Sequence, residues 1–235
     1  MDIHSPQAMQ EESHRHPLKS KRRIVTRALW VLLGSLGALV ALLAGLSGRP
    51  AQLQAAGSTT RFVAPAPLGS DAGNDCASRY APCATVFRAL GQANSGDEIR
   101  VAAGTYTDPL TITKDIRLLG GYTTTNWVEQ DPDAYPTTLD GGGSARVILI
   151  QTNADVTISG FHIQKGQADV GAGVYNQGGT LTLAGCYIHD NVDSGSSYGG
   201  AGVANAATLF LRGNRIYSNT TSDPDGSGGG VSIRG

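Results

Sequence analysis

The chain has 235 residues, of which 40% are hydrophobic and 16% charged, and its formal net charge is −1. This length allows one sizeable domain with an appended segment. The charge is uneven: residues 1–27 carry six Lys/Arg and three Asp/Glu, whereas the remainder is mildly acidic. An acidic remainder argues against nucleic acid as a partner. Glycine is abundant but has no three-residue period, which excludes collagen.

The N-terminal part predicts export. Residues 1–27 are polar and end in a basic cluster, as in a disordered cytoplasmic tail. Residues 28–47 contain no charged side chain, and a helix of this length spans about 30 Å, the thickness of a bilayer core. The basic flank places the N-terminus in the cytoplasm and the rest outside. A transmembrane anchor and a cleaved signal sequence remain alternatives, and both predict an extracytoplasmic domain.

Residues 48–67 are rich in Ala, Pro, Gln, Ser and Thr, which predicts a linker. Residues 68–96 are interpreted as an N-terminal cap. Cys76 and Cys83 lie close together in a segment expected to be exported, so we predict a disulfide between them. Cys186 is then a buried free thiol. Residues 84–94 have apolar side chains on one helical face and predict a helix that covers the end of the following domain.

Residues 97–235 contain a repeat. The segment from Val156 to Ile163 recurs twice, and its glycine returns as Gly160, Gly185 and Gly213, spaced 25 and 28 residues apart. A fixed period in this range indicates stacked supersecondary units. Apolar residues alternate with small or polar ones, which predicts β-strands rather than helices.

Each repeat predicts three short strands, formed by the motifs Gly-x-Gly-Val, Leu-x-Leu-x-Gly and x-x-Ile-x-x-Asn. Stacking one coil on the next would align the aliphatic residues in columns that fill a central core, with Leu183 between Ile158 and Leu211. The recurrent Gly and Asn are expected at sharp bends with left-handed backbone angles. Stacked Asn side chains could also hydrogen-bond as a ladder.

These residues carry a resemblance to the right-handed parallel β-helix proteins of the pectin-lyase-like superfamily. The segments from Gly199 to Val203 and from Asn214 to Asn219 resemble the repeat of polymorphic outer-membrane proteins. The resemblance implies an all-β, right-handed parallel β-helix over 97–235. It specifies the fold and leaves the activity open, since this architecture hosts adhesins, lyases, hydrolases and spacers. The chain stops within a repeat, so we expect the domain to be incomplete at its C-terminal end.

Between the first coils, residues 121–136 form a long excursion that contains Tyr122, Trp127 and Tyr135. Aromatic side chains stack well on sugar rings, so these three are the candidate ligand-binding residues. The alternative is that they pack the excursion onto the coil. Asp223 and Asp225 resemble the start of a calcium loop but lack its full ligand spacing, so a solvated turn is favoured and no metal or other cofactor is predicted.

No catalytic constellation is found in the sequence. We therefore predict a non-catalytic cell-surface module that binds a glycan or a protein, or acts as a spacer. The alternative is the N-terminal part of a polysaccharide lyase or glycoside hydrolase that acts on acidic polysaccharides. Its catalytic coils would then lie beyond residue 235.

Overall fold

The computed structural model describes residues 57–195, 199–222 and 228–234. The predicted tail, the apolar segment 28–47, the start of the predicted linker and the candidate calcium residues Asp223 and Asp225 lie outside the described residues. Among the residues that the structure describes, no helix combines the length and apolar character needed to cross a membrane.

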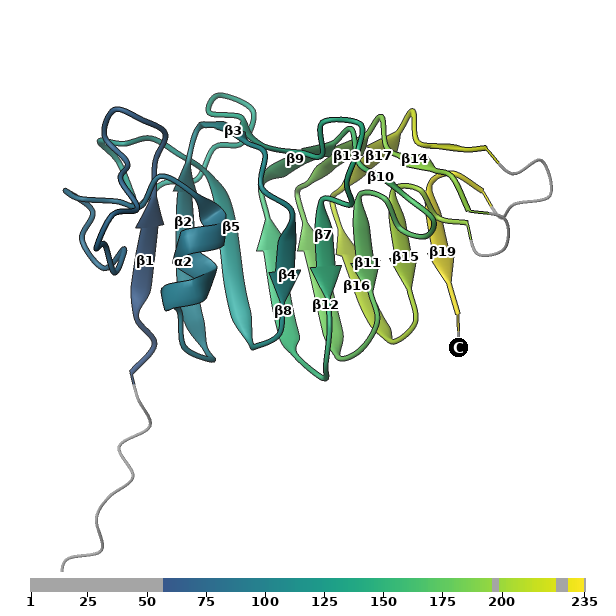
Figure 1. The fold of residues 1–235 in the computed structure, drawn as a ribbon, viewed down its shortest axis with the longest axis horizontal. Helices are drawn as coiled ribbons and strands as arrows, with labels where there is room; N and C mark the ends of the chain where they lie inside the picture. Colours follow the sequence, from purple (N-terminus) through teal and green to yellow (C-terminus); the bar gives the residue numbers. More distant parts are fainter. Residues whose placement is uncertain (1–56, 196–198, 223–227, 235) are drawn as a thin grey trace, which may run out of the picture. The chain divides into compact units, whose positions relative to one another are not determined.

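The described chain is a stack of coils made from short strands (Figure 1). Each coil repeats the same strand order, so every strand pairs with its counterpart one coil later, and four columns result, here called sheets 1 to 4. Pairings between strands are parallel throughout the described part. The fold is therefore mostly β and β-helix-like, as predicted.

Sheet 1 consists of β1 (Thr60–Val63), β2 (Asp97–Ala102), β5 (Ile116–Tyr122), β8 (Asp155–Ser159), β12 (Thr180–Ala184) and β16 (Thr208–Arg212). Sheet 2 consists of β4 (Leu110–Ile112), β7 (Ile148–Ile150), β11 (Val174–Asn176), β15 (Val203–Asn205) and β19 (Val231–Ile233). Sheet 3 consists of β3 (Gly104–Tyr106), β6 (Thr137–Asp140), β9 (Phe161–Gln164), β13 (Tyr187–His189) and β17 (Arg215–Tyr217). Sheet 4, which the sequence did not predict, consists of β10 (Gln167–Ala168), β14 (Val192–Asp193) and β18 (Thr220–Thr221).

The inward-facing side chains form one aliphatic core. Leu183 in β12 lies in register with Ile158 in β8 and Leu211 in β16, which confirms the predicted column. Ile158 and Leu183 are fully buried, whereas Leu211 in the last described turn of sheet 1 is 41% exposed. Burying one such side chain contributes about 1.5–3 kcal/mol, so the columns supply the main stabilisation.

Two turns in the later coils use left-handed backbone angles. The glycines that follow β8, β12 and β16, which are Gly160, Gly185 and Gly213, have φ angles of 72°, 58° and 61°, a region that is strained for residues with a side chain. At the turn after sheet 3, the residue before the repeat asparagine adopts this angle, as in Asp190 (φ 55°) and Ser218 (φ 54°). Lys165 (φ 50°) adopts it at the equivalent turn, where Gly166 takes the place of the asparagine. The expectation that the asparagines themselves are left-handed is wrong, because they serve as inward hydrogen-bonding residues instead.

Buried asparagines link neighbouring coils. At the last position of two sheet 2 strands, the Nδ2 atom of Asn176 donates to Oδ1 of Asn205, 2.7 Å away, and both side chains are buried. A second row, formed by Asn191 and Asn219, follows sheet 3. Amide side chains carry both donors and acceptors, so one residue type can bond to itself in every coil. The predicted asparagine ladder is therefore confirmed at the turn after sheet 3, and the Asn176–Asn205 pair was not predicted.

The N-terminal end of sheet 1 begins earlier than predicted. Strand β1 lies within 48–67, so the linker prediction is wrong for Thr60–Val63, and β1 rather than the strand at residue 97 comes first in sheet 1. The backbone of the disulfide loop forms hydrogen bonds with the free edge of β1. Phe62 N donates to Cys76 O (2.8 Å) and Cys83 N donates to Phe62 O (2.9 Å). A four-residue strand carries too few alternating positions to stand out in a Pro- and Ala-rich segment.

The predicted capping helix is α2 (Val86–Gln92), which contacts β1, β2 and β4 (Figure 1). Its N-cap is Thr85, whose side chain accepts a hydrogen bond from the backbone of Arg88 at 3.0 Å. Val86, Ala89 and Leu90 are its buried residues. Phe87, predicted on the same apolar face, is 65% exposed instead, because seven helical residues bury only a narrow stripe.

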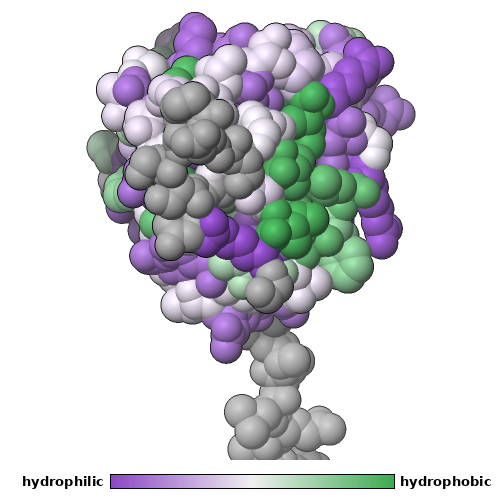
Figure 2. Space-filling model, turned by 90° about the vertical axis from the view of Figure 1, so that its right-hand side faces the viewer, coloured by the Kyte–Doolittle hydropathy of each residue, from purple (hydrophilic) through white to green (hydrophobic). Residues whose placement is uncertain are grey.

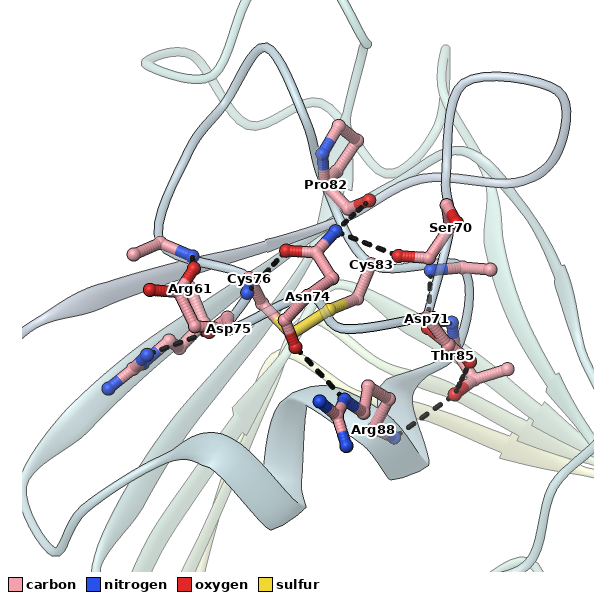
Figure 3. The surroundings of a disulfide bond; sticks show 12 residues. Arg61, Ser70, Asp71, Asn74, Asp75, Cys76, Pro82, Cys83, Thr85 and Arg88 are labelled. Atoms are coloured by element: carbon pink, nitrogen blue, oxygen red, sulfur yellow. Dashed lines mark hydrogen bonds between the residues drawn. A yellow bond between two sulfur atoms is a disulfide. The ribbon is translucent and has the colours of Figure 1, made fainter.

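Cys76 and Cys83 form the predicted disulfide, with their Cα atoms 5.0 Å apart, and Cys186 is a buried free thiol. Asn74 organises the surrounding loop (Figure 3). Its Nδ2 atom donates to the carbonyls of Ser70, Ala81 and Pro82, and its Oδ1 accepts from Cys76 N at 2.8 Å. The backbone oxygen of Asn74 accepts from Arg88 Nε of helix α2 at 3.0 Å. The loop is thus tied to both the disulfide and the helix.

The opposite end of the described stack exposes apolar side chains. In the described residues, β16 and β19 pair with a strand on one side only. Phe210, Leu211 and Ile233 are 48%, 41% and 67% exposed. Figure 2 views this end and shows apolar side chains gathered between hydrophilic rims.

Candidate functional site

The outer face of sheet 1 carries polar side chains in register. Because strand residues alternate between the two faces, the residues next to the core columns point outward. Pairing aligns them in two rows that cross the coils. One row is Glu98, Arg117, Thr157, Thr182 and Phe210, and the other is Arg100, Leu119, Ser159, Ala184 and Arg212.

The excursion between β5 and β6 forms a wall along these rows. Val128 and Gln130 line a groove of about 650 Å³ together with most residues of the two rows. The Nε2 atom of Gln130 donates to the carbonyls of Gly120 (2.7 Å) and Ser159 (3.2 Å). These bonds fix the wall to two successive coils, so the groove is a preformed feature of the sheet surface.

The groove has more cationic than anionic groups. It contains three arginines, Arg100, Arg117 and Arg212, against the single carboxylate of Glu98. That carboxylate accepts hydrogen bonds from Arg100 Nε at 2.6 Å and Arg117 Nη1 at 2.7 Å. Arg100 also donates to the carbonyl of Trp127, while Arg212 has no ion pair among the described residues. One carboxylate cannot neutralise three guanidinium groups, so the groove attracts anions.

The three aromatic residues predicted to bind a ligand differ in how far they are buried. Tyr122 and Trp127 are each 4% exposed and form a small cluster with Phe62, whose ring centroid is 5.2 Å from that of Trp127. Burial also raises the pKa of the Tyr122 phenol. Tyr135 is 42% exposed. The packing role therefore fits Tyr122 and Trp127, and a binding role for Tyr135 stays a prediction.

The groove residues were not singled out from the sequence. The structure shows arginines and hydroxyls on this face. The available signal was the alternation itself, since the residues between Leu181 and Leu183 or Val156 and Ile158 must face outward. The place of Arg212 in one of the rows follows from the register of β16 with β12, which aligns it with Ala184.

A separate row of rings covers the outer face of sheet 3. His162 stacks on Tyr187 with ring centroids 4.5 Å apart and an angle of 3° between the planes, and His189 stacks on Tyr217 at 4.9 Å. His189 is buried, and its Nδ1 lies 2.8 Å from the Asp190 carboxylate. Within the described ranges, no group of three metal-ligating side chains comes together.

Comparison with family models matches residues 69–234 to a family described as "Protein of unknown function (DUF1565)". The chain belongs to the DUF1565 family. The matched region includes the disulfide loop, helix α2, the groove and every described strand after β1. The DUF1565 match and the parallel sheets together support a β-helix-like fold. Neither the curated proteins nor the solved structures gave a match to the chain.

Proposed function

We propose that this DUF1565 chain is an exported, non-catalytic module that binds an acidic glycan along the outer face of sheet 1. The observation that carries the proposal is the excess of arginine over carboxylate in a preformed groove. We also propose that the fold is a right-handed parallel β-helix of the pectin-lyase-like type. Its repeats would be similar to those of polymorphic outer-membrane proteins.

The groove offers the groups that an acidic glycan needs. Arg117 and Arg212 present guanidinium donors, which bind carboxylates and sulfates with charge-assisted hydrogen bonds. Thr157, Ser159 and Thr182 add hydroxyls between them. At the end of one row, Phe210 is 48% exposed and gives an apolar surface for a sugar ring. A polymer lying across the coils would meet an equivalent position about every 4.8 Å.

Three features support the proposed export. The basic tail and the apolar segment 28–47 direct the remainder across a membrane, either anchored or secreted. The buried Cys76–Cys83 disulfide is compatible with an oxidising compartment. The proposed location is therefore the cell surface or the extracellular space, where glycans are available as partners.

Binding is favoured over the hydrolase form of the alternative, and the lyase form is decided by the product analysis below. Glycoside hydrolysis ordinarily uses two carboxyl groups that flank the scissile bond. The one carboxylate of the groove, Glu98, is occupied by Arg100 and Arg117. A purely structural spacer is the remaining alternative, and it would need no cationic groove.

The test is retention of the full chain on immobilised polygalacturonate and heparin, with neutral dextran as the comparison. We expect the chain to be retained on the acidic polymers, and this retention to weaken as the salt concentration rises. We expect no retention on dextran. Arg117→Gln and Arg212→Gln should each weaken binding about fivefold to tenfold, because each removes a partly exposed charge-assisted contact.

The matched control is Arg215→Gln, which removes an exposed arginine from sheet 3 and should leave retention unchanged. Equal losses for all three variants would mean that overall charge rather than the groove binds the polymer. Shortened chains in the products after incubation would instead establish the enzymatic alternative. No retention on any acidic polymer would leave the spacer role.

A further inference from the structure

A second concave space lies between the disulfide loop and the excursion. Arg79 and Tyr80 line it from the loop, and Thr124, Thr125 and Trp127 line it from the excursion. Its volume is about 370 Å³, and it shares no lining residue with the groove on sheet 1. Volumes of this size are typical of small-ligand pockets. We refer to it as the loop cleft.

Tyr80 supplies an open aromatic surface to the loop cleft. The residue is 77% exposed, although burying an aromatic side chain is normally favourable. Arg79 fixes the ring, because its guanidinium carbon lies 4.8 Å from the ring centroid and its Nη2 donates to the Tyr80 hydroxyl at 2.6 Å. The backbone N–H of Tyr80 donates to the Ser78 hydroxyl at 3.3 Å. The ring is therefore held in place while it remains exposed.

The loop that carries Tyr80 is rigid at its base. The Cys76–Cys83 disulfide closes it, and the Asn74 side chain hydrogen-bonds to both ends of the loop, at Cys76 and Pro82 (Figure 3). Arg61 Nη1 adds a hydrogen bond to the carbonyl of Asp75 at 2.7 Å. A rigid loop with an aromatic residue at its tip loses little conformational entropy when a ligand binds.

The excursion supplies polar groups opposite Tyr80. Thr124 and Thr125 bring two hydroxyls, and Thr125 Oγ1 lies 3.2 Å from Thr123 Oγ1. Trp127 forms the inner side of the cleft, and its indole nitrogen is covered and has no acceptor among the described residues. Buried donors without a partner are rare in folded proteins, so this one reduces the stability of the excursion. The excursion itself is held by the packing of Trp127 on Phe62.

We propose that the loop cleft is a saccharide-binding site that takes one sugar ring against Tyr80. Sugar rings have apolar C–H faces that pack on aromatic rings, and hydroxyls that exchange hydrogen bonds with Thr124, Thr125 and Arg79. The lining contains one cation and no carboxylate, so neutral and acidic sugars fit and cationic ligands do not. The site stands on its own residues and does not depend on the groove.

Trp127 gives the experiment a direct signal. The chain has two tryptophans, Trp30 and Trp127, so the full chain with Trp30→Phe reports on the cleft alone. The probes are methyl glucoside, galactose, N-acetylglucosamine and galacturonic acid, titrated while Trp127 emission is recorded. We expect a saturable change in emission with at least one probe. Tyr80→Ala should weaken that binding at least tenfold, and Tyr80→Phe should retain most of it.

Tyr217→Ala is the control, because Tyr217 is an exposed aromatic residue of β17 in sheet 3 that does not line the cleft. It should leave the titration unchanged, and the melting temperatures of all variants should agree. Emission that responds to none of the four sugars, or binding that survives Tyr80→Ala, overturns the proposal. Retention on acidic polymers is measured separately through Arg117 and Arg212, so failure of one site does not imply failure of the other.

Discussion

The Nδ2 atom of Asn191 donates a hydrogen bond to the Oδ1 atom of Asn219, one coil further on, across 2.9 Å. Asn191 is fully buried, and its own Oδ1 accepts from the backbone of Gly166 at 2.8 Å. Its Nδ2 also reaches the carbonyls of Ile163 and His189. One side chain therefore connects three successive coils at a turn where the backbone has no complete ladder of its own.

Removing this side chain should be costly. In Asn191→Ala, the Gly166 N–H and the Ile163 carbonyl lose a buried partner, and each such group costs about 1–3 kcal/mol. We expect the free energy of unfolding to fall by about 3 kcal/mol in urea denaturation. Asn153→Ala, an exposed asparagine of the same chain, should change it by less than about 0.5 kcal/mol. Similar losses for both variants would contradict the ladder's role.

The core column around Leu183 gives a graded prediction. Leu183 is fully buried between Ile158 and Leu211, so Leu183→Ala should destabilise the protein by about 2–5 kcal/mol. Leu183→Asp should prevent folding, because it places an unpaired charge in the core. Leu211→Ala occupies the same column but starts 41% exposed, so its loss should be clearly smaller. Equal losses for the two alanine variants, measured by thermal unfolding, would refute the column.

The cysteines should differ sharply in reactivity. Cys76 and Cys83 should resist alkylation until the protein is reduced. Cys186 is free but fully buried, and burial raises the pKa of its thiol to about 11. It should react with iodoacetamide at pH 8 only after unfolding, because the thiolate is the reactive form. Mass mapping of native and denatured samples checks both points, and rapid native labelling of Cys186 would contradict them.

The disulfide also makes a stability prediction. Closing a loop of about eight residues lowers the entropy of the unfolded chain by an amount worth about 2.5 kcal/mol. The double variant Cys76→Ser with Cys83→Ser should lose about that much in urea denaturation. Cys186→Ser is unsuitable as a control because it buries a hydroxyl. The reduced wild-type protein serves instead, and its free energy of unfolding should match that of the double variant. An unchanged free energy of unfolding would show that Asn74 alone fixes the loop.

The pH dependence of stability should include a contribution from His162. Burial and the nearby His189 lower the pKa of its imidazole below the usual 6.5. The unfolded chain therefore binds a proton more readily, so stability is full above about pH 7 and falls as the pH drops through 6.5. The fall levels off below the lowered folded-state pKa. His162→Gln should flatten the profile in this window, as measured by melting temperature, and an unchanged slope would contradict it.

The repeat itself made much of the fold predictable. The register of Leu183 and the pairing of asparagines across coils followed from spacing alone, since each coil repeats the same strands. Strand β1 was missed because it has no counterpart in the repeats and its edge is completed by the disulfide loop. Such a pairing depends on residues that are distant in the sequence, which periodicity does not show.

The candidate sites were harder to predict. The excess of arginine becomes visible only when Arg117 in β5 and Arg212 in β16 are placed on one face of one sheet. The loop cleft joins Tyr80 to Thr125 across a long stretch of chain. Trp127 was chosen for its chemistry, but the structure buries its ring against Phe62. Aromatic type alone does not distinguish a packing residue from a contact residue.

The way the first coil is covered has a consequence for local opening. Each coil contacts only its neighbours, so stability is approximately a sum of terms between adjacent coils. Around β2, opening must disrupt the next coil, strand β1 and helix α2 together. Amide protons of β2 should therefore exchange as slowly as those of β8 inside the stack, so that thermal fluctuations do not enter the solenoid through its N-terminal coil.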